Sequence, residues 1–214
     1  MLPAADPKTW GPSLDEAVNA LQRGGIVVLP TDTVYGVGCD AFNPEAVAAV
    51  LEAKGRGRQM PPPVLMPGID TVAGLGRDVS DSARALMEAF WPGPLTIIVR
   101  SQPSLAWDLG DTGGTVALRV PNHPVALALL ARTGPMAVTS ANRTGEPAAT
   151  TAAGAADQLG DAVSVYLDGG DAPLGEASTI VDATDDRMRI VRTGGVSREA
   201  IVDTVGEEAL EAEQ

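Results

Sequence analysis

Pro30-Thr31-Asp32-Thr33-Val34-Tyr35-Gly36 is the stretch that decides the fold, because it follows directly on a short apolar run. That run, Ile26-Val27-Val28-Leu29, is rich in β-branched residues and is bounded by Gly24-Gly25 and Pro30, a pattern that predicts a buried strand. The hydroxyl groups of Thr31 and Thr33 therefore stand at the end of a core strand. In open α/β sheets, ligands bind at that end of the strands.

A predicted helix and a basic segment follow. Asn43-Pro44 is typical of an N-cap with proline in the first turn, and Gly55 can adopt the left-handed conformation that ends a helix. Lys54, Arg56 and Arg58 then gather at the helix end, where cations can complement the helix dipole or bind a phosphate. Lys54 is one of two lysines among 15 basic residues, which favours the phosphate interpretation.

Composition limits the function classes. The chain has 214 residues and a net charge of −13, which argues against broad electrostatic capture of nucleic acid or of an anionic membrane. A single cysteine, Cys39, excludes an internal disulfide and gives no metal-ligand spacing, so we expect it to be a small buried hydrophobe. The longest wholly apolar run is 125–131 and the N-terminus lacks the apolar core of a signal peptide, which predicts a soluble cytoplasmic protein.

The remaining pattern mixes helices and strands. Ser13 and Glu16 have the spacing of a capping box, and further helices are predicted at 81–91, 124–132, 151–159 and 197–205. Strands are predicted at 64–66, 95–100, 115–120, 136–139, 163–167, 178–182 and 188–192. The connection 101–114 is long for a hairpin, and such loops in compact domains tend to be lids or binding loops.

These elements predict one α/β domain with a twisted mixed sheet flanked by helices. We place the domain at residues 13–205. Residues 1–12 are expected to be a loose N-terminal segment, and 206–214 an acidic, frayed C-terminal tail.

Hydroxyl groups follow three apolar strands, at Thr31/Thr33, Thr139/Ser140 and Ser178/Thr179. Such residues also form turns and caps, but strands of one sheet would bring these three ends to a common rim. Arg119 either points outward from a half-exposed strand or offers its guanidinium to a carboxylate. His123, between two prolines at a helix start, is interpreted as structural. No glycine-rich phosphate-binding fingerprint is present, so any phosphate must be bound by discrete side chains.

Taken in order, these residues resemble the successive signatures of the YrdC-like threonylcarbamoyl-AMP synthase family in its single-domain form. The resemblance runs from about residue 13 to 198. It rests on Pro30 to Gly36, Lys54-x-Arg56, Trp91-Pro92-Gly93-Pro94-Leu95-Thr96, Arg119-Val120-Pro121-x-His123-Pro124, Thr139-Ser140-Ala141-Asn142 and Ser178-Thr179-Ile180-Val181-Asp182.

The resemblance implies a YrdC/RibB-like fold with an open concave groove, and the formation of threonylcarbamoyl-AMP and pyrophosphate from L-threonine, bicarbonate or CO2, and ATP. It implies Mg²⁺ bound with the ATP, no protein metal site, and a product passed to a tRNA threonylcarbamoyl transferase complex, with at most a weak local contact to tRNA and none to membranes. The implied catalytic residues are Lys54, Arg56, Ser140 and Asn142. The implied ATP contacts add Thr115, Ala141 and Arg192, and the implied threonine contacts are Thr33, Arg119, Thr139 and Ser178.

The chain departs from the family pattern between Arg58 and Met66. Many relatives have proline after Lys-x-Arg and a histidine near the end of the next strand, whereas this chain has Gly57 and Val64-Leu65-Met66. Two other functions stay open: a related carbamoyl-adenylate-forming domain with another carbamoyl source, and a non-catalytic RNA-binding module. The second needs a wide basic surface, which 15 basic against 28 acidic residues make hard to build.

Overall fold

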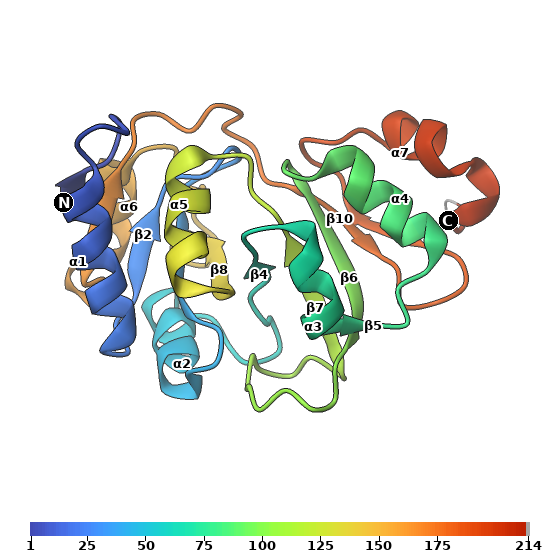
Figure 1. Cartoon of the computed structure of the whole chain (residues 1–214), viewed down its shortest axis with the longest axis horizontal. Coiled ribbons are helices and arrows are strands. Elements are labelled where there is room, and N and C mark those ends of the chain that lie inside the picture. Colours follow the sequence, from blue (N-terminus) through green and yellow to red (C-terminus); the bar gives the residue numbers. More distant parts are fainter. Residues whose placement is uncertain (213–214) are drawn as a thin grey trace.

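The buried run after Gly24-Gly25 forms strand β2 (Val27–Leu29), which turns back through the Pro30 stretch and pairs antiparallel with β3 (Gly36–Asp40). This hairpin lies near the middle of the left half of the molecule in Figure 1, a computed structural model that describes residues 1–212. The predicted strand is confirmed. Its partner β3 was not predicted as a strand, because it contains two glycines and no alternating pattern.

The strands form one mixed sheet, as predicted, in the order β1-β9-β2-β3-β8-β4-β7-β6-β10-β11, with β5 paired to β6. Neighbours such as β9 and β2 are parallel, whereas β6 and β7 are antiparallel. The other strands are β1 (Leu2–Pro3), β4 (Val64–Leu65), β5 (Gly76–Arg77), β6 (Leu95–Ser101), β7 (Thr115–Arg119), β8 (Met136–Ser140), β9 (Val165–Asp168), β10 (Thr179–Asp182) and β11 (Arg189–Arg192).

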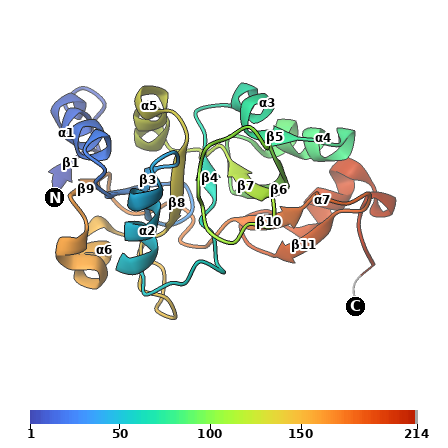
Figure 2. The same ribbon diagram turned by 90° about the horizontal axis from the view of Figure 1, so that it is seen from below.

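Helices cover both faces of one half of the sheet. The helices are α1 (Gly11–Gln22), α2 (Pro44–Ala53), α3 (Val72–Leu75), α4 (Asp81–Phe90), α5 (Pro124–Thr133), α6 (Ala152–Leu159) and α7 (Arg198–Val205). Figure 2 shows α1 and α5 on one side of the sheet and α6 on the other. The α2 cap is as predicted, since the side chain of Asn43 accepts a hydrogen bond from the Ala46 amide and Gly55 has φ +61°.

The core follows the two-residue period of the strands. Val27 and Leu29 pack in one apolar cluster with α1 and α5, and Val28 packs in a second cluster with α2 and α6. Cys39 is fully buried in that second cluster, which confirms its prediction as a small core residue. The β2 strand is therefore buried on both faces, and this fixes where the polar loop after it emerges.

The other half of the sheet is covered differently on its two faces. Leu95 and Ile97 of β6 pack in the core with α4, and α3 and α4 lie on that side of β6 and β7 (Figure 2). Thr96 and Ile98, which alternate with them, face the opposite side and line a cleft. This half of the sheet therefore supplies the concave groove that the family resemblance implied.

The N-terminal segment is more ordered than expected. Residues Leu2–Pro3 pair with β9, Ala4 is buried, and α1 begins at Gly11 rather than at Ser13. The capping-box prediction is wrong, because Pro12 starts the helix one turn earlier and the Ser13 hydroxyl donates to the Pro3 carbonyl, 2.6 Å away.

The C-terminal residues are also more ordered than expected. Glu207–Ala209 form a 3₁₀ turn, and Leu210 is buried and bridges to Met188, so the frayed tail is wrong for these residues. Apolar burial of Leu210 outweighs the acidic character of its neighbours. The last two positions of the predicted tail, 213–214, lie outside the described residues. Within residues 1–212, no helix has both the length and the apolar character that crossing a bilayer requires.

Candidate active site

The cleft has a volume of about 380 Å³ and is open at the concave side of the sheet. Its walls come from the loop after β2, the segment after α2, and strands β6, β7, β8, β10 and β11. The polar residues that line it are Thr31, Thr33, Tyr35, Arg56, Thr96, Thr112, Thr115, Arg119, Thr139, Ser140, Ser178 and Arg192. The common rim predicted for three strand ends is confirmed, except that the Thr179 hydroxyl is buried and donates to the Val196 carbonyl.

The two threonines of the β2–β3 loop form a directed hydrogen-bond chain. The Thr31 hydroxyl donates to the Val34 carbonyl, 2.6 Å away, so the 2.9 Å contact between the two hydroxyls makes Thr33 the donor to Thr31. The Thr33 oxygen in turn accepts from Arg119 at 2.9 Å. Thr33 therefore presents an oxygen that can accept one further hydrogen bond in the cleft but has no proton left to donate.

Arg119 is buried and pairs with a carboxylate, which decides between the two interpretations of its sequence position. Its Nη2 lies 2.6 Å from Oδ1 of Asp32, and its Nε donates to the Gly93 carbonyl. Three of the five guanidinium N–H groups are thus used by Gly93, Thr33 and Asp32, leaving two for a ligand. Burial lowers the pKa of Arg119, while the Asp32 charge acts in the opposite direction.

Two more arginines approach the same space from other elements. Arg56, from the segment after α2, donates to the Thr139 hydroxyl at 2.9 Å. Arg192, at the end of β11, donates twice to the Ser178 carbonyl and once to its hydroxyl, which also contacts Thr96 at 2.8 Å. Burial, and for Arg56 also the nearby Arg192 charge, lowers the pKa of both guanidinium groups. Arg56 is partly buried and Arg192 is exposed, and an anion bound between their like charges would stabilise the arrangement.

Lys54 does not face the cleft. Its ammonium group donates to the backbone carbonyls of Ser140 and Asn142, at 2.5 and 2.6 Å, and lies 3.5 Å from the Asn142 side-chain oxygen. The residue is 3% exposed, and burial, followed by the Arg56 charge, lowers its pKa to about 8. Lys54 therefore holds the turn after β8 in place, and its predicted contact with phosphate stays a prediction.

Asn142 is the partner of Lys54 in this support. Its side-chain nitrogen donates to the carbonyls of Arg143 and Glu146, both at 2.9 Å. Both N–H groups of the side chain are therefore used within the turn. The predicted catalytic set thus separates into two layers. Arg56 and Ser140 line the cleft, whereas Lys54 and Asn142 lie behind it.

The structure brings most of the predicted site residues together. Thr33, Arg56, Thr115, Arg119, Thr139, Ser140, Ser178 and Arg192 all line the cleft, and Ala141 joins Lys54 and Asn142 behind it. Sequence reasoning did not select Asp32 or Thr96. The signal for Thr96 was available, because it is the polar residue in the apolar run Leu95 to Val99. His123 caps α5 by accepting from the Val125 amide at 3.3 Å, which confirms its structural role.

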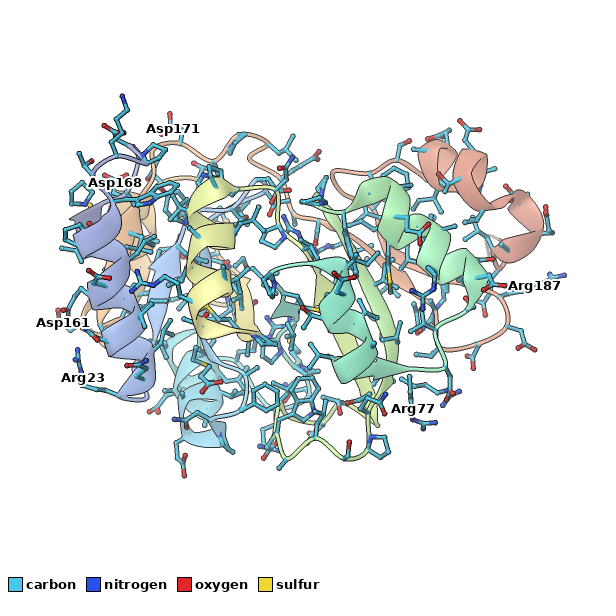
Figure 3. The ribbon with its side chains drawn as sticks, viewed as in Figure 1. Arg23, Arg77, Asp161, Asp168, Asp171 and Arg187 are labelled. Carbon is cyan, nitrogen blue, oxygen red and sulfur yellow. The ribbon has the colours of Figure 1, made fainter. Side chains whose placement is uncertain are left out.

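Carboxylates are scarce around this site. Asp32 is engaged by Arg119, and Asp168 and Asp171 lie at the edge of the molecule beside α1 (Figure 3). Within residues 1–212, no three Asp, Glu, His or Cys side chains gather as a set of metal ligands. The donor set of the cleft is cationic and hydroxylic, and this suits anionic ligands better than a metal ion.

The chain is similar to proteins of a known family. The Sua5/YciO/YrdC family model, described as "Telomere recombination", matches residues 19–194. A Mycobacterium tuberculosis protein named putative threonylcarbamoyl-AMP synthase is 52% identical over 205 residues, covering 96% of this chain and 94% of that protein.

Solved structures extend the likeness to the fold. Pyrococcus abyssi Sua5 complexed with L-threonine has a TM-score of 0.90 and 30% identity, covering 96% of this chain. Escherichia coli YciO has a TM-score of 0.82 and 25% identity, covering 94% of this chain and 97% of that one. The chain spans 60% of the length of the Sua5 chain.

Proposed function

The chain belongs to the Sua5/YciO/YrdC family, and from this premise we propose that it is an L-threonylcarbamoyladenylate synthase. The enzyme is a nucleotidyltransferase that joins L-threonine, CO2 from bicarbonate, and ATP into threonylcarbamoyl-AMP and pyrophosphate. The product serves the threonylcarbamoyladenosine modification of tRNA next to the anticodon. It passes to a tRNA threonylcarbamoyl transferase complex, with at most a weak local contact to tRNA.

One observation carries this proposal: Arg56, Arg119 and Arg192 converge on one cleft in a chain whose net charge is −13. Among residues 1–212, the Arg56 Nε is a buried donor without a partner. An unpaired buried N–H costs about 1–3 kcal/mol, so an anion that accepts from it is bound more tightly. All the proposed reactants carry negative charge or become negative during the reaction.

The layout supports distinct places for the two larger substrates. We assign the ATP phosphates to Arg56, Arg192 and Ser140, with Thr115 beside the nucleotide. The threonine carboxylate is assigned to the two free N–H groups of Arg119. Thr33, Thr139 and Ser178 offer the hydroxyl oxygens around the amino acid.

Lys54, Ala141 and Asn142 act from behind the cleft in this assignment. The Lys54 ammonium fixes the carbonyls of Ser140 and Asn142, and this orients the Ser140 hydroxyl toward the phosphates. Their contribution is preorganisation, because a donor held in place before the reaction needs no rearrangement when charge develops.

The chemistry requires no nucleophile from the protein. The threonine amine attacks CO2 to give a carbamate, a carbamate oxygen attacks the α-phosphorus of ATP, and pyrophosphate leaves. The protein aligns these groups, neutralises their charge and shields the short-lived carbamate from water. Each charge-assisted hydrogen bond from an arginine to phosphate contributes about 1.5–3 kcal/mol.

Magnesium enters this proposal with the nucleotide. The polar residues that line the cleft are cationic or hydroxylic, so they do not form a resident metal site. Phosphate oxygens of ATP would carry the ion, and no step is assigned to a protein-bound metal.

The test is pyrophosphate release from ATP by the purified chain. Release should require both L-threonine and bicarbonate, and the adenylate should be detected by mass spectrometry. Release supported by another carbamoyl donor, such as carbamoyl phosphate, without threonine would instead identify the related carbamoyl-adenylate chemistry. Tight, salt-sensitive tRNA binding with no pyrophosphate release would favour the RNA-binding module.

A matched pair of variants tests the site. Arg56→Ala should lower kcat/KM about 10- to 100-fold, which corresponds to the loss of one charge-assisted hydrogen bond. Arg77→Ala removes an exposed arginine whose ion pair with Asp78 lies away from the cleft, and should leave the rate unchanged. Equal rates for the two variants would contradict the assignment of Arg56.

A further inference from the structure

Two segments that are far apart in the sequence form one wall of the cleft. The segment after α2 contributes Met60 and Pro61, and the long β6–β7 connection contributes Leu109 and Thr112. The first segment also carries Arg56, assigned above to the nucleotide phosphates. The relative position of the two segments therefore sets the position of Arg56 against the β7 side of the cleft.

An ion pair joins these segments. The Arg58 guanidinium makes two parallel hydrogen bonds to the Asp108 carboxylate, at 2.8 and 3.0 Å. The carboxylate is already oriented, because its Oδ1 also accepts from the Gly110 amide at 3.0 Å. The Asp111 amide donates to the Arg58 carbonyl at 2.9 Å, which adds a backbone contact between the same two segments.

Gly110 shows how closely the segments approach. Its φ is +106°, and a Cβ at this position would lie 2.6 Å from the Arg58 carbonyl oxygen. The loop has a second attachment nearby, where Trp107 stacks on Phe42 at the start of α2, with ring centroids 5.5 Å apart. The β6–β7 loop is thus held against the α2 side at two places rather than hanging free.

We propose that Arg58 and Asp108 are positioning residues for the proposed reaction: their ion pair holds the two segments together so that Arg56 is in place before ATP binds. The proposal rests on the proposed function only in its choice of ATP as the ligand. Both side chains are about half exposed, and exposed ion pairs usually contribute little. This pair differs because it is bidentate and because it joins two walls of one site.

The expected effect is on nucleotide affinity. Without the ion pair, the two segments keep more conformational freedom that must be lost when ATP binds. Arg58→Ala should therefore raise the Kd for a non-hydrolysable ATP analogue about five-fold, the equivalent of roughly 1 kcal/mol. KM for ATP should rise by a similar factor while kcat changes little. High salt should weaken binding to the wild-type chain more than to the variant.

Three further variants and one control variant make the test specific. Asp108→Ala should reproduce most of the effect of Arg58→Ala, because Arg58 then keeps only its longer contact of 3.6 Å with the Asp111 carboxylate, and the exchanged pair Arg58→Asp with Asp108→Arg should restore part of the affinity. Gly110→Ala separates the segments without changing any charge, and should also weaken nucleotide binding. Arg132→Ala is the matched control, because it removes an exposed ion pair of 2.6 Å with Asp15 that joins α5 to α1 away from the cleft.

Measurements of ATP binding alone would not distinguish failure of the positioning role from failure of the proposed function. Amide hydrogen exchange is therefore measured on the ligand-free chain, where Arg58→Ala should speed exchange in both 56–63 and 104–112 and Arg132→Ala in neither. If the wild type does not bind ATP, the proposed function fails while the exchange data still judge the ion pair. Unchanged exchange in Arg58→Ala, or an exchanged pair no better than the single variants, would overturn the positioning role.

Discussion

The ammonium group of Lys54 lies 2.5 Å from the carbonyl oxygen of Ser140, a residue 86 positions later in the chain. This contact joins the end of α2 to the end of β8, and a second one to the Asn142 carbonyl makes the junction two-pronged. The two sequence motifs that suggest one phosphate-binding set, Lys54-x-Arg56 and Ser140-x-Asn142, therefore contact each other through the Lys54 ammonium group. One member of each motif faces the cleft, and the other supports it from behind.

Replacing Lys54 and replacing Arg56 should have different effects on the free energy of unfolding. Lys54→Ala removes this donor from the Asn142 carbonyl, whereas the Ser140 carbonyl still accepts from the Asn142 amide at 3.0 Å, so we expect the free energy of unfolding to fall by about 1–3 kcal/mol. Arg56→Ala removes one hydrogen bond to Thr139 and relieves repulsion from Arg192, so its stability should stay within about 1 kcal/mol of the wild type. Urea denaturation measures both.

Nucleotide binding completes this comparison. Both variants should bind ATP weakly, Arg56→Ala because the proposed phosphate contact is lost and Lys54→Ala because the Ser140 turn is displaced. The distinguishing quantity is stability. If Lys54→Ala unfolds at the same urea concentration as the wild type, its ammonium does not support the turn.

The lowered pKa of Lys54 predicts a pH dependence of stability. Its pKa falls from 10.5 to about 8 because of burial and the neighbouring Arg56 charge. Between these two values the unfolded chain binds the proton and the folded chain does not, so the unfolding free energy due to this group rises with pH. A tenfold difference in proton affinity corresponds to about 1.4 kcal/mol, so the gain from pH 7 to pH 10 should be about 2–3 kcal/mol.

Lys54→Met isolates this contribution, because other groups titrate equally in both proteins. The wild type should gain stability relative to Lys54→Met as the pH rises, with the change centred above pH 8. Urea denaturation at a series of pH values gives the difference. Parallel curves, or a difference that falls with pH, would show that the folded chain holds the Lys54 proton as tightly as the unfolded one.

Local chemistry accounts for what could be predicted from the sequence. The buried strand after Gly24-Gly25, the Asn43 cap and the left-handed Gly55 each depend on residues within one or two turns of chain. These features are confirmed. The start of α1 was wrong because two local signals competed, and Pro12 determined the start rather than Ser13.

Long-range contacts account for what could not be predicted. The motif with Lys54 reads as a cationic cluster, but the target of the ammonium is set by the turn after β8, which only the folded sheet brings near. The same holds for Asp32 and Arg119, which pair across 87 positions. Arg58 likewise reads as part of the basic cluster, yet its partner Asp108 lies in a separate loop.

Two substitutions of Asp32, in its buried ion pair with Arg119, should lower the free energy of unfolding by different amounts. Both side chains are only 8% exposed, and removing one partner of a buried pair costs about 3–5 kcal/mol because the other charge is left uncompensated. Asp32→Ala should approach that cost. Asp32→Asn should cost less, since its side-chain oxygen can still accept from Arg119 and from the Asn122 amide.

A double variant checks the origin of this effect. Combining Asp32→Ala with Arg119→Met removes both charges, and its unfolding free energy should exceed that of Asp32→Ala alone. Threonine binding should be lost in the double variant, because the proposed carboxylate contact is gone, but retained in part by Asp32→Asn. Additive losses in urea denaturation would contradict a coupled pair.

The Tyr35 hydroxyl connects the loop after β2 to the acidic glycine loop after β9. It donates to the Gly170 carbonyl at 2.6 Å and accepts from the Gly169 amide at 3.1 Å, while the residue itself is fully buried. Tyr35→Phe leaves both backbone groups without this partner, so the unfolding free energy should fall by about 1–3 kcal/mol. The chain continues from Gly170 to Ser178 at the cleft, so threonine affinity should fall as well.

Tyr166→Phe is the matched control for this prediction. Its hydroxyl also donates to a glycine carbonyl at 2.6 Å, that of Gly160, but neither residue lines the cleft. We expect similar destabilisation in the two variants and weaker threonine binding only in Tyr35→Phe, measured by calorimetric titration at a temperature where both are folded. Equal threonine affinity in the two variants would mean that the glycine loop after β9 is held for stability alone, because Ser178 would then keep its position without the Tyr35 contact.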